Sequence, residues 1–246
     1  MQNVLVTGIT GGIGGAVAKQ LLEEGSTVIG IDLELDERIS LLANAYPESL
    51  SLHTFDLSNT DELPLVVKAL VKEHGRIGGF VHCAGFDKMA PLHMAKAHDY
   101  ESLWRIHALV PMLLIGAICK RPNHVERMGM VLISSQSAHE GAQGHAAYAA
   151  AKGAIEGFLA PAAAELMDKG IRLNEVCLAP IRTAMAMSWM DRLTDEDLAK
   201  LEASYPLGIG EPEDAARLIC YLLSEDAHFI NGQVITADGG HAVRKV

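Results

Sequence analysis

The stretch Val4-Leu5-Val6-Thr7-Gly8-Ile9-Thr10-Gly11-Gly12-Ile13-Gly14 places a short apolar run directly before a glycine-rich turn. Apolar residues then recur at Val17, Leu21 and Leu22 until Gly25, a spacing typical of a helix. A strand, a glycine turn and a helix in this order point backbone amides at a pyrophosphate. The stretch therefore predicts a dinucleotide site that uses Gly8, Thr10, Gly12, Ile13 and Gly14.

Strand and helix patterns alternate along the rest of the chain. Further strands are expected at residues 27–31, 50–55, 79–83, 130–134, 171–177 and 233–236, and helices at residues 36–45, 60–74, 99–119 and 146–169. This alternation implies an α/β fold with a parallel sheet covered by helices on both faces. No repeat or linker interrupts the 246 residues, so residues 1–246 are expected to form a single domain.

The segment 181–205 differs in character from its surroundings, because it gathers Met185, Met187, Trp189 and Met190. It follows the sixth expected strand, at the carboxyl edge of the sheet, where open α/β folds bind ligands. We therefore expect it to cover a substrate. The alternative is an ordinary amphipathic helix packed on the core.

Composition excludes several classes of partner. The chain has 20 basic and 31 acidic residues and a net charge of −11, which opposes binding to nucleic acid or to anionic membranes. No apolar run reaches about 18 residues and no charged leader precedes the first strand, so a cytoplasmic protein is expected. The four cysteines and 11 histidines form neither Cys-x-x-Cys nor His-Glu-x-x-His patterns, so free thiols and no metal site are expected.

Tyr148 and Lys152 have the spacing Tyr-x-x-x-Lys, which places them on one face of a helix. The Lys152 ammonium is expected to lower the pKa of Tyr148 from about 10, so that the phenol can exchange a proton near neutral pH. Ser135, upstream, can hydrogen-bond the same substrate oxygen and stabilise its partial charge. Each residue taken alone also fits a packing, capping or solvated role.

Asp32 ends the second expected strand, roughly 20 residues beyond the glycine turn. A carboxylate there can accept hydrogen bonds from an adenosine ribose and would repel a 2′-phosphate. Neither Gly11 nor Leu33 offers a cation for such a phosphate, so NAD is predicted over NADP. The alternative is a solvated loop carboxylate.

In combination, these motifs resemble the short-chain dehydrogenase/reductase family over nearly the whole chain. The matching pieces are Thr7-Gly8-x-x-x-Gly12-x-Gly14, Asp56-Leu57, Ala84-Gly85, Ser135, Tyr148-x-x-x-Lys152, Pro180 with Thr183 and Met185, and Asp238-Gly239-Gly240. The resemblance implies a doubly wound (Rossmann) sheet of seven parallel strands and a homo-oligomer, a tetramer or a dimer.

The resemblance also implies the site residues. Tyr148 would be the general acid/base and Lys152 would bind the nicotinamide ribose. The other cofactor contacts that it implies are Asp56 and Leu57 at the adenine, Ala84 and Gly85 where the cofactor approaches closely, and Pro180, Ile181 and Thr183 near the carboxamide.

Four positions, in three places along the chain, depart from the family pattern. His107 stands where the family usually has an asparagine that supports a proton-relaying water. Its imidazole either takes over that role, with turnover depending on pH near ~6.5, or is a core histidine. His82-Cys83 replaces a common Asn-Asn pair, and Ile181 follows Pro180 in place of glycine.

The predicted function is NAD-dependent hydride transfer between a small or medium secondary alcohol and its ketone, with Tyr148 as acid/base. The substrate contacts expected are Ser135, His139, Gln143, His145, Met185 and Trp189. A 3-oxoacyl carrier-protein reductase is the alternative with the same chemistry. A noncatalytic dinucleotide-binding sensor is the alternative from another class.

Overall fold

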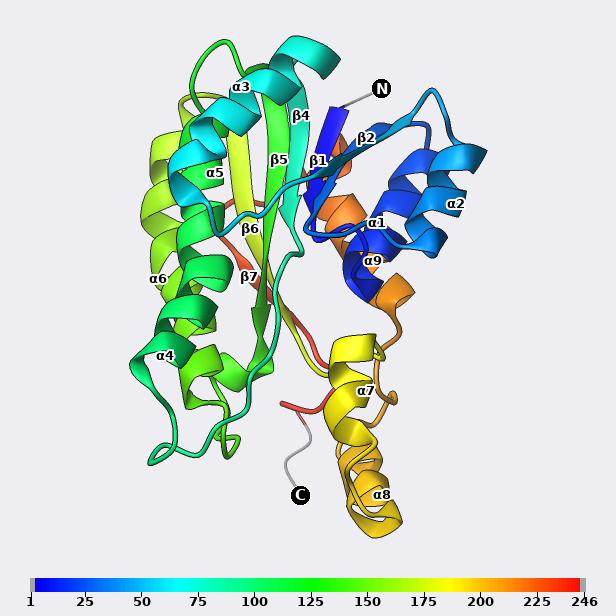
Figure 1. The fold of residues 1–246 in the computed structure, drawn as a ribbon, viewed down its shortest axis with the longest axis vertical. Helices are drawn as coiled ribbons and strands as arrows, with labels where there is room; N and C mark the ends of the chain where they lie inside the picture. The colour runs from blue at the N-terminus through cyan, green and yellow to red at the C-terminus, as the bar shows by residue number, and fades with distance from the viewer. Residues whose placement is uncertain (1–2, 244–246) are drawn as a thin grey trace.

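The computed structural model of the chain describes residues 3–243. Within that range the central sheet is fully parallel, with the strand order β3-β2-β1-β4-β5-β6-β7 (Figure 1). The strands are β1 (Asn3–Thr7), β2 (Thr27–Asp32), β3 (Leu50–Thr54), β4 (Ile77–His82), β5 (His124–Ser135), β6 (Ile171–Leu178) and β7 (Val234–Ala237). The doubly wound seven-stranded fold expected from the sequence is confirmed.

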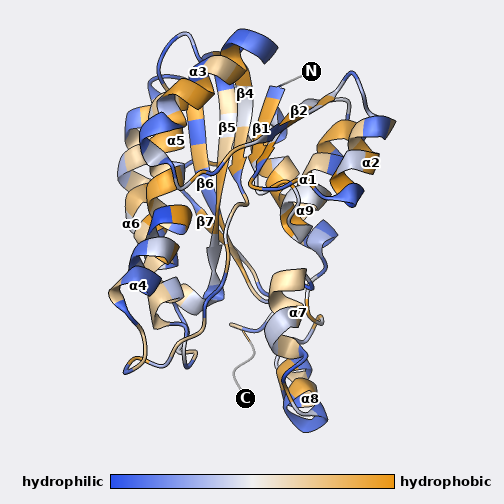
Figure 2. Cartoon of the chain, viewed as in Figure 1, coloured by the Kyte–Doolittle hydropathy of each residue, from blue (hydrophilic) through white to orange (hydrophobic). Residues whose placement is uncertain are grey.

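Helices cover both faces of this sheet. One face carries α3 (Leu63–His74), α5 (Val110–Ile118) and α6 (Ala146–Met167), and the other carries α1 (Gly12–Glu23), α2 (Glu37–Ala45) and α9 (Pro212–Leu223), as Figure 1 shows. The buried apolar side chains form one core on each face, because strands buried on both sides need apolar residues at nearly every position. In Figure 2, orange marks hydrophobic residues, which occur in the strands and in the helices that pack against them.

The helix expected at residues 99–119 is not a regular α-helix. It comprises α4 (Ala97–Trp104), a π-helical turn η2 (Arg105–Leu109) and α5, with Pro111 near the start of α5. Because proline has no N–H and its ring crowds the preceding turn, it disturbs the regular hydrogen-bond ladder here. The turn places His107 toward the carboxyl edge of the sheet.

The same run, Ala97–Ile118, is long and apolar enough to cross a membrane by length and composition alone. Half of it is buried inside the fold, where its α5 part packs in the core beside α3. Its packing in the protein core accounts for the apolar composition of this run.

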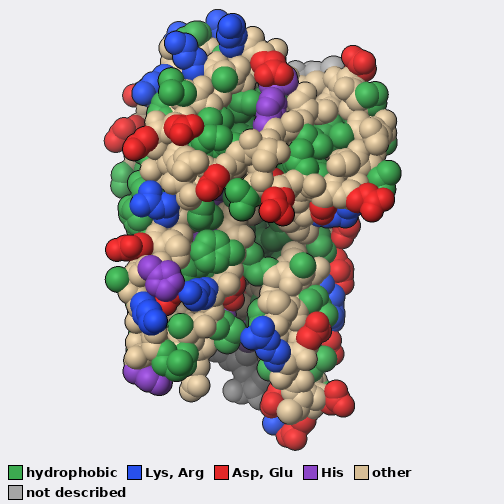
Figure 3. Space-filling view, in the orientation of Figure 1, with side chains coloured by type: hydrophobic (Ala, Val, Ile, Leu, Met, Phe, Trp, Pro, Cys, Tyr) green, Lys and Arg blue, Asp and Glu red, His purple; other side chains and the backbone are tan. Residues whose placement is uncertain are grey.

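Beyond the carboxyl edge of the sheet lie α7 (Ala184–Met190) and α8 (Asp195–Ala203), which project from the body of the molecule (Figure 1). Together they make up most of the segment 181–205. Figure 3 shows the surface hollowed between this projection and the part of the molecule that carries α4. The sheet's carboxyl ends, the glycine turn and α7 thus surround one hollow.

Candidate active site

The glycine turn between β1 and α1 is packed so closely that side chains are excluded. A Cβ on Gly14 would lie 2.1 Å from the Gly8 carbonyl oxygen, and one on Gly8 would lie 2.4 Å from the Ala84 nitrogen. Gly12 has the same constraint, since a Cβ there would lie 2.7 Å from Thr183 Cγ2. The turn is therefore a backbone cradle of the kind that admits a pyrophosphate at a helix amino terminus.

A cavity of about 300 Å³ lies between the glycine turn and the ends of β2, β3 and β4. Most of the residues expected at the adenosine half of a dinucleotide line it: Gly8, Thr10, Asp32, Asp56, Leu57, Ala84 and Gly85. Asp32 Oδ2 accepts hydrogen bonds from the Thr10 nitrogen at 2.8 Å and from Thr10 Oγ1 at 2.6 Å. Asp32 therefore fixes the turn as well as facing the cavity.

Arg38, in the first turn of α2, was missed by sequence reasoning. Its guanidinium donates a hydrogen bond to the Thr10 carbonyl oxygen and lies 3.7 Å from Asp36 Oδ2. A cation therefore stands beside the Thr10–Asp32 contact, although neither Gly11 nor Leu33 supplies one. No sequence spacing indicated this position, because α2 reaches the turn only through the fold.

A second cavity, of about 450 Å³, adjoins the glycine turn at the carboxyl ends of β5 and β6. The expected residues among its lining are Ile13, Ser135, Gln143, His145, Tyr148, Pro180, Ile181, Thr183, Met185 and Trp189. Ser135 lies near the Tyr148 hydroxyl, where its side chain acts to lower the Tyr148 pKa against the larger effect of burial. The structure thus brings the proposed acid/base, its hydrogen-bonding serine and the apolar α7 residues into one cavity.

Lys152 is buried one turn after Tyr148 in α6. Its Nζ donates a 2.7 Å hydrogen bond to the Ile133 carbonyl oxygen and lies 5.6 Å from the centre of the Tyr148 ring. Burial lowers the pKa of Lys152 from 10.5 to about 8, against the opposing charge of Glu175. Burial, together with the nearby Asp87, raises the pKa of Tyr148 above its ordinary 10. The expectation of a lowered Tyr148 pKa is therefore wrong for this arrangement, because desolvation of the phenol and the charge of Asp87 together raise it.

Replacing Lys152 with methionine is expected to stabilise the fold at neutral pH. The fall in the pKa of Lys152 from 10.5 to about 8 corresponds to a cost of about 3 kcal/mol for burying the charged side chain. The variant also loses the hydrogen bond to the Ile133 carbonyl oxygen, which reduces the expected gain in stability by about 1 kcal/mol. The cost is complete below pH 8 and disappears as the pH rises to the unfolded pKa of 10.5. Urea unfolding at pH 7 and pH 10 measures the free energy of unfolding of Lys152→Met relative to the native chain. Lys169→Met, at an exposed lysine, is the control. An equal gain at both pH values would contradict the account.

His107 and His82 are buried and neutral. His107 Nε2 donates to the Phe86 carbonyl oxygen at 2.7 Å, and the ring meets the Tyr148 ring edge-on with centres 5.0 Å apart. Burial, aided by Lys152, lowers the pKa of His107 well below 6.5, and lowers that of His82 to about 3. The expectation that His107 makes turnover depend on pH near 6.5 is therefore wrong, since the ring stays uncharged through that range.

The polar substrate residues expected from the sequence are placed differently from one another. His145 Nε2 lies 3.1 Å from Asp87 Oδ2 at the cavity, and the Asp87 hydrogen bond raises the pKa of His145. His139 is absent from the cavity lining; its Nε2 lies 2.9 Å from Glu156 Oε1 on α6. The substrate contact expected of His139 therefore stays a prediction, which this placement does not support. Asp87 was missed, because it lies in a loop without a distinctive pattern.

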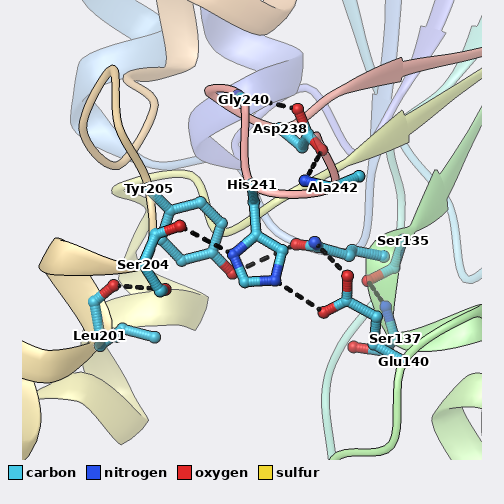
Figure 4. Close-up of polar contacts among 11 residues, drawn as sticks. Ser135, Ser137, Glu140, Leu201, Ser204, Tyr205, Asp238, Gly240, His241 and Ala242 are labelled. Atoms are coloured by element: carbon cyan, nitrogen blue, oxygen red, sulfur yellow. Dashed lines mark hydrogen bonds and ion pairs between the residues drawn. The ribbon is translucent and has the colours of Figure 1, made fainter. Parts of the chain in front are cut away.

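The far wall of the cavity is joined to the C-terminal segment by a polar network (Figure 4). The Tyr205 hydroxyl donates to Gln136 Oε1 at 3.1 Å, and Gln136 Nε2 donates to Glu140 Oε1 at 2.6 Å. His241 stacks on Tyr205 with ring centres 4.7 Å apart and reaches Glu140 Oε2 at 3.3 Å. Asp238, from the terminal Asp-Gly-Gly motif, accepts from the Gly240 and Ala242 nitrogens and so shapes this turn. The segment after β7 therefore holds the loop that follows Ser135.

Comparison with known proteins identifies relatives over the full length of this fold. Residues 8–242 match a family model described as enoyl-(acyl carrier protein) reductase. The chain is 30% identical over 243 residues to the 3-oxoacyl-[acyl-carrier-protein] reductase of Thermotoga maritima, covering 96% of each chain. It is 28% identical to a diacetyl reductase, (S)-acetoin forming, of Staphylococcus epidermidis, covering 99% of each.

Solved structures agree with this. A short-chain dehydrogenase/reductase of Brucella melitensis, described as a glucose/ribitol dehydrogenase, superposes with a TM-score of 0.88 at 27% identity, covering 98% of this chain and 96% of the other. The glycine cradle, two adjoining cavities and the Ser135–Tyr148 contact are the features that a nicotinamide dinucleotide and its substrate require. The chain therefore belongs to the short-chain dehydrogenase/reductase family of oxidoreductases, which use a nicotinamide dinucleotide.

Proposed function

We propose that the protein is an NAD-dependent dehydrogenase that interconverts a small or medium secondary alcohol and its ketone. The observation that carries this proposal is that Ser135 and Tyr148 line one cavity, which adjoins the glycine cradle, with Ser135 near enough to influence the Tyr148 hydroxyl. The cradle and the cavity lined by Asp32 and Asp56 fit a dinucleotide. When bound, the nicotinamide would accept or supply the hydride.

The residues of the chain then have separate tasks. Tyr148 removes the proton from the alcohol oxygen, or returns it to the ketone oxygen, and Ser135 hydrogen-bonds that oxygen so that its partial charge is stabilised. Lys152, buried behind the ring of Tyr148, would hydrogen-bond the ribose next to the nicotinamide. Burial raises the pKa of Tyr148, which favours the protonated phenol that donates to a ketone oxygen. In the oxidising direction the phenolate takes the alcohol proton, so Tyr148 must first release its own proton to solvent, a loss that the positive charges of Lys152 and of the bound nicotinamide would favour.

The lining of the larger cavity supports a partly apolar substrate. Met185, Trp189 and Leu193 come from the segment 181–205, and Met89 faces them from the loop after β4. Gln143 and the His145–Asp87 pair add polar groups on the same lining. A pocket that is mostly apolar with a few polar contacts suits a small alcohol with a short carbon chain, and the segment 181–205 would cover it.

A preference for NAD over NADP is the expected result of cofactor kinetics. Asp32 repels a 2′-phosphate at close range, so kcat/KM with NAD should exceed that with NADP by at least about ten-fold. The measurement is NADH and NADPH formation across a panel of secondary alcohols, for the native chain and for Asp32→Asn, which should lose part of the preference. A preference for NADP that disappears in Arg38→Ala would overturn this assignment.

Arg38 is the observation that favours the alternative, a 3-oxoacyl carrier-protein reductase. A guanidinium beside Thr10 suits a 2′-phosphate, and the relative from Thermotoga maritima bears that activity in its name. The net charge of −11 opposes docking of an acidic carrier protein. If every alcohol fails and the chain still binds NAD tightly, the noncatalytic sensor becomes the better account.

We also propose that the protein acts in the cytoplasm as a homo-oligomer, a tetramer or a dimer, on a small molecule and without nucleic-acid or membrane partners. An apolar groove between α4 and α6 supports self-association, since it is lined by Tyr100, Trp104, Ala147, Ala150 and Ala151. Light scattering with size-exclusion chromatography is expected to give a mass two or four times that of the chain. An active monomer at micromolar concentration would remove this proposal.

A further inference from the structure

We propose that His139, Glu156 and Cys177 form a binding site for a divalent transition-metal ion of the zinc type. The site lies on the α6 side of the sheet, behind the strand end that carries Ser135. It is separate from the cavity proposed for hydride transfer and does not depend on that proposal.

The three donor atoms are already gathered. His139 Nε2, a Glu156 carboxylate oxygen and Cys177 Sγ all lie within 4.8 Å of one another, and the His139 to Glu156 distance is 2.9 Å. Imidazole, carboxylate and thiolate are the ligands that zinc prefers, with bonds of about 2.0–2.3 Å. Donors with this separation need to move by no more than about 1 Å to share one tetrahedral ion, which leaves a fourth position for water or another oxygen.

Supporting contacts already orient two of these donors. The Ser134 hydroxyl donates to Glu156 Oε1 at 2.7 Å, and Cys177 is hydrogen-bonded to Thr236 on the neighbouring strand β7. Residues that hold a metal usually have such partners, which fix their direction. The donors also differ in exposure: the His139 side chain is 53% exposed, whereas Cys177 is buried. An ion can therefore reach the cluster from solvent on the His139 side.

Glu175 supplies an independent reason to expect a cation here. Its side chain is fully buried, two residues before Cys177 on β6. Within residues 3–243, neither of its carboxylate oxygens has a hydrogen-bond partner of good geometry, and the nearby Ser134 hydroxyl donates to Glu156 instead. A buried carboxylate without partners is costly, and Glu156 adds a second acidic group. Burial raises the pKa of Glu175 to about 7, and a divalent cation bound at the neighbouring cluster would favour its ionised form and that of Glu156.

Binding has a simple proton balance. The ion forms bonds to neutral His139, to ionised Glu156 and to the Cys177 sulfur, whose S–H bond breaks and whose proton leaves to solvent. No electron is transferred and no other reactant is needed.

A second group of possible donors provides an internal control. His53, Glu73 and His74 also lie within reach of a common ion, on β3 and the end of α3. Their ligand set contains no sulfur, so cobalt bound there gives no thiolate-to-metal charge-transfer absorption. Of these two clusters within residues 3–243, the one with Cys177 has the sulfur donor and has the unpartnered Glu175 two residues away on the same strand, and for that reason the inference rests on it.

The test is titration of the full-length protein, reduced and freed of metal, with Co²⁺ and then with Zn²⁺ as competitor. We expect one Co²⁺ per chain to produce a near-ultraviolet thiolate-to-cobalt band, which Zn²⁺ abolishes. His139→Ala changes an exposed side chain and should weaken the Co²⁺ affinity by at least roughly ten-fold, and Cys177→Ser should remove the band. Cys119→Ala and His53→Ala are matched controls and should retain it.

Two results would overturn the inference: binding of Co²⁺ without the thiolate band, or a band that persists unchanged in both His139→Ala and Cys177→Ser. Far-ultraviolet circular dichroism establishes that each variant is folded. Because the readout is spectroscopic, it is independent of whether the protein oxidises any alcohol.

Discussion

The Tyr148→Phe variant is expected to fold, to bind NAD and to lose a factor of about 10²–10⁴ in kcat/KM for a secondary alcohol. The change removes one hydroxyl, the group that exchanges a proton with the substrate oxygen, and leaves the ring packed against His107. The polar interaction of this hydroxyl with Ser135 is lost as well. Initial rates of NADH formation give kcat/KM for the alcohol, and a separate binding titration gives the affinity for NAD.

Tyr205→Phe is the matched control, because Tyr205 lines the same cavity and also hydrogen-bonds within it, to Gln136. Loss of that neutral hydrogen bond costs about 1 kcal/mol, so its kcat/KM should change by no more than about ten-fold. If Tyr148→Phe and Tyr205→Phe lower the rate equally, the assignment of Tyr148 as acid/base is wrong.

Gly14→Ala is expected to have the largest effect on cofactor binding among single-methyl changes. The new Cβ would lie 2.1 Å from the Gly8 carbonyl oxygen and 3.1 Å from Ile9 Cα, both backbone atoms, so the turn itself must move. Overpacking of this kind costs roughly 1–3 kcal/mol of stability. Loss of a similar energy from the cradle would weaken NAD binding by roughly 5- to 150-fold. Calorimetric titration with NAD and urea unfolding measure the two effects.

Gly153→Ala is its control on another helix. A Cβ at Gly153 in α6 meets no atom within 4 Å among residues 3–243, and replacing a helical glycine with alanine gains up to about 1 kcal/mol. This variant should be as stable as the native chain or more so, with unchanged NAD affinity. Unchanged NAD affinity in Gly14→Ala would show that the turn does not form the cofactor cradle.

Most of the fold was predictable because its signals are local. The β1 strand, the glycine turn and α1 follow from the consecutive residues 4–25, and the parallel order follows from repeated β-α alternation. Pro111 was a local signal for the break in the expected helix 99–119, which the sequence analysis did not use. The π-helical form of the turn at Arg105–Leu109 was not predictable from any residue pattern.

The candidate site was predictable wherever spacing within one element decides the placement, as for Tyr148 and Lys152 on α6. The contacts made between elements were not. Arg38 reaches Thr10 from α2, and His139 turns to Glu156 on α6. The pKa of Tyr148 was misjudged for the same reason, because the burial that raises it comes from distant segments of the chain.

The most direct test of the central claim follows the hydrogen itself. The protein is incubated with NAD and a secondary alcohol that carries deuterium on its carbinol carbon, and the resulting nucleotide is analysed by mass spectrometry. The account predicts NADH carrying one deuterium, formed by the native chain and reduced by about 10²–10⁴ in rate with Tyr148→Phe. Tight NAD binding without transfer of deuterium from any alcohol of the panel would contradict it.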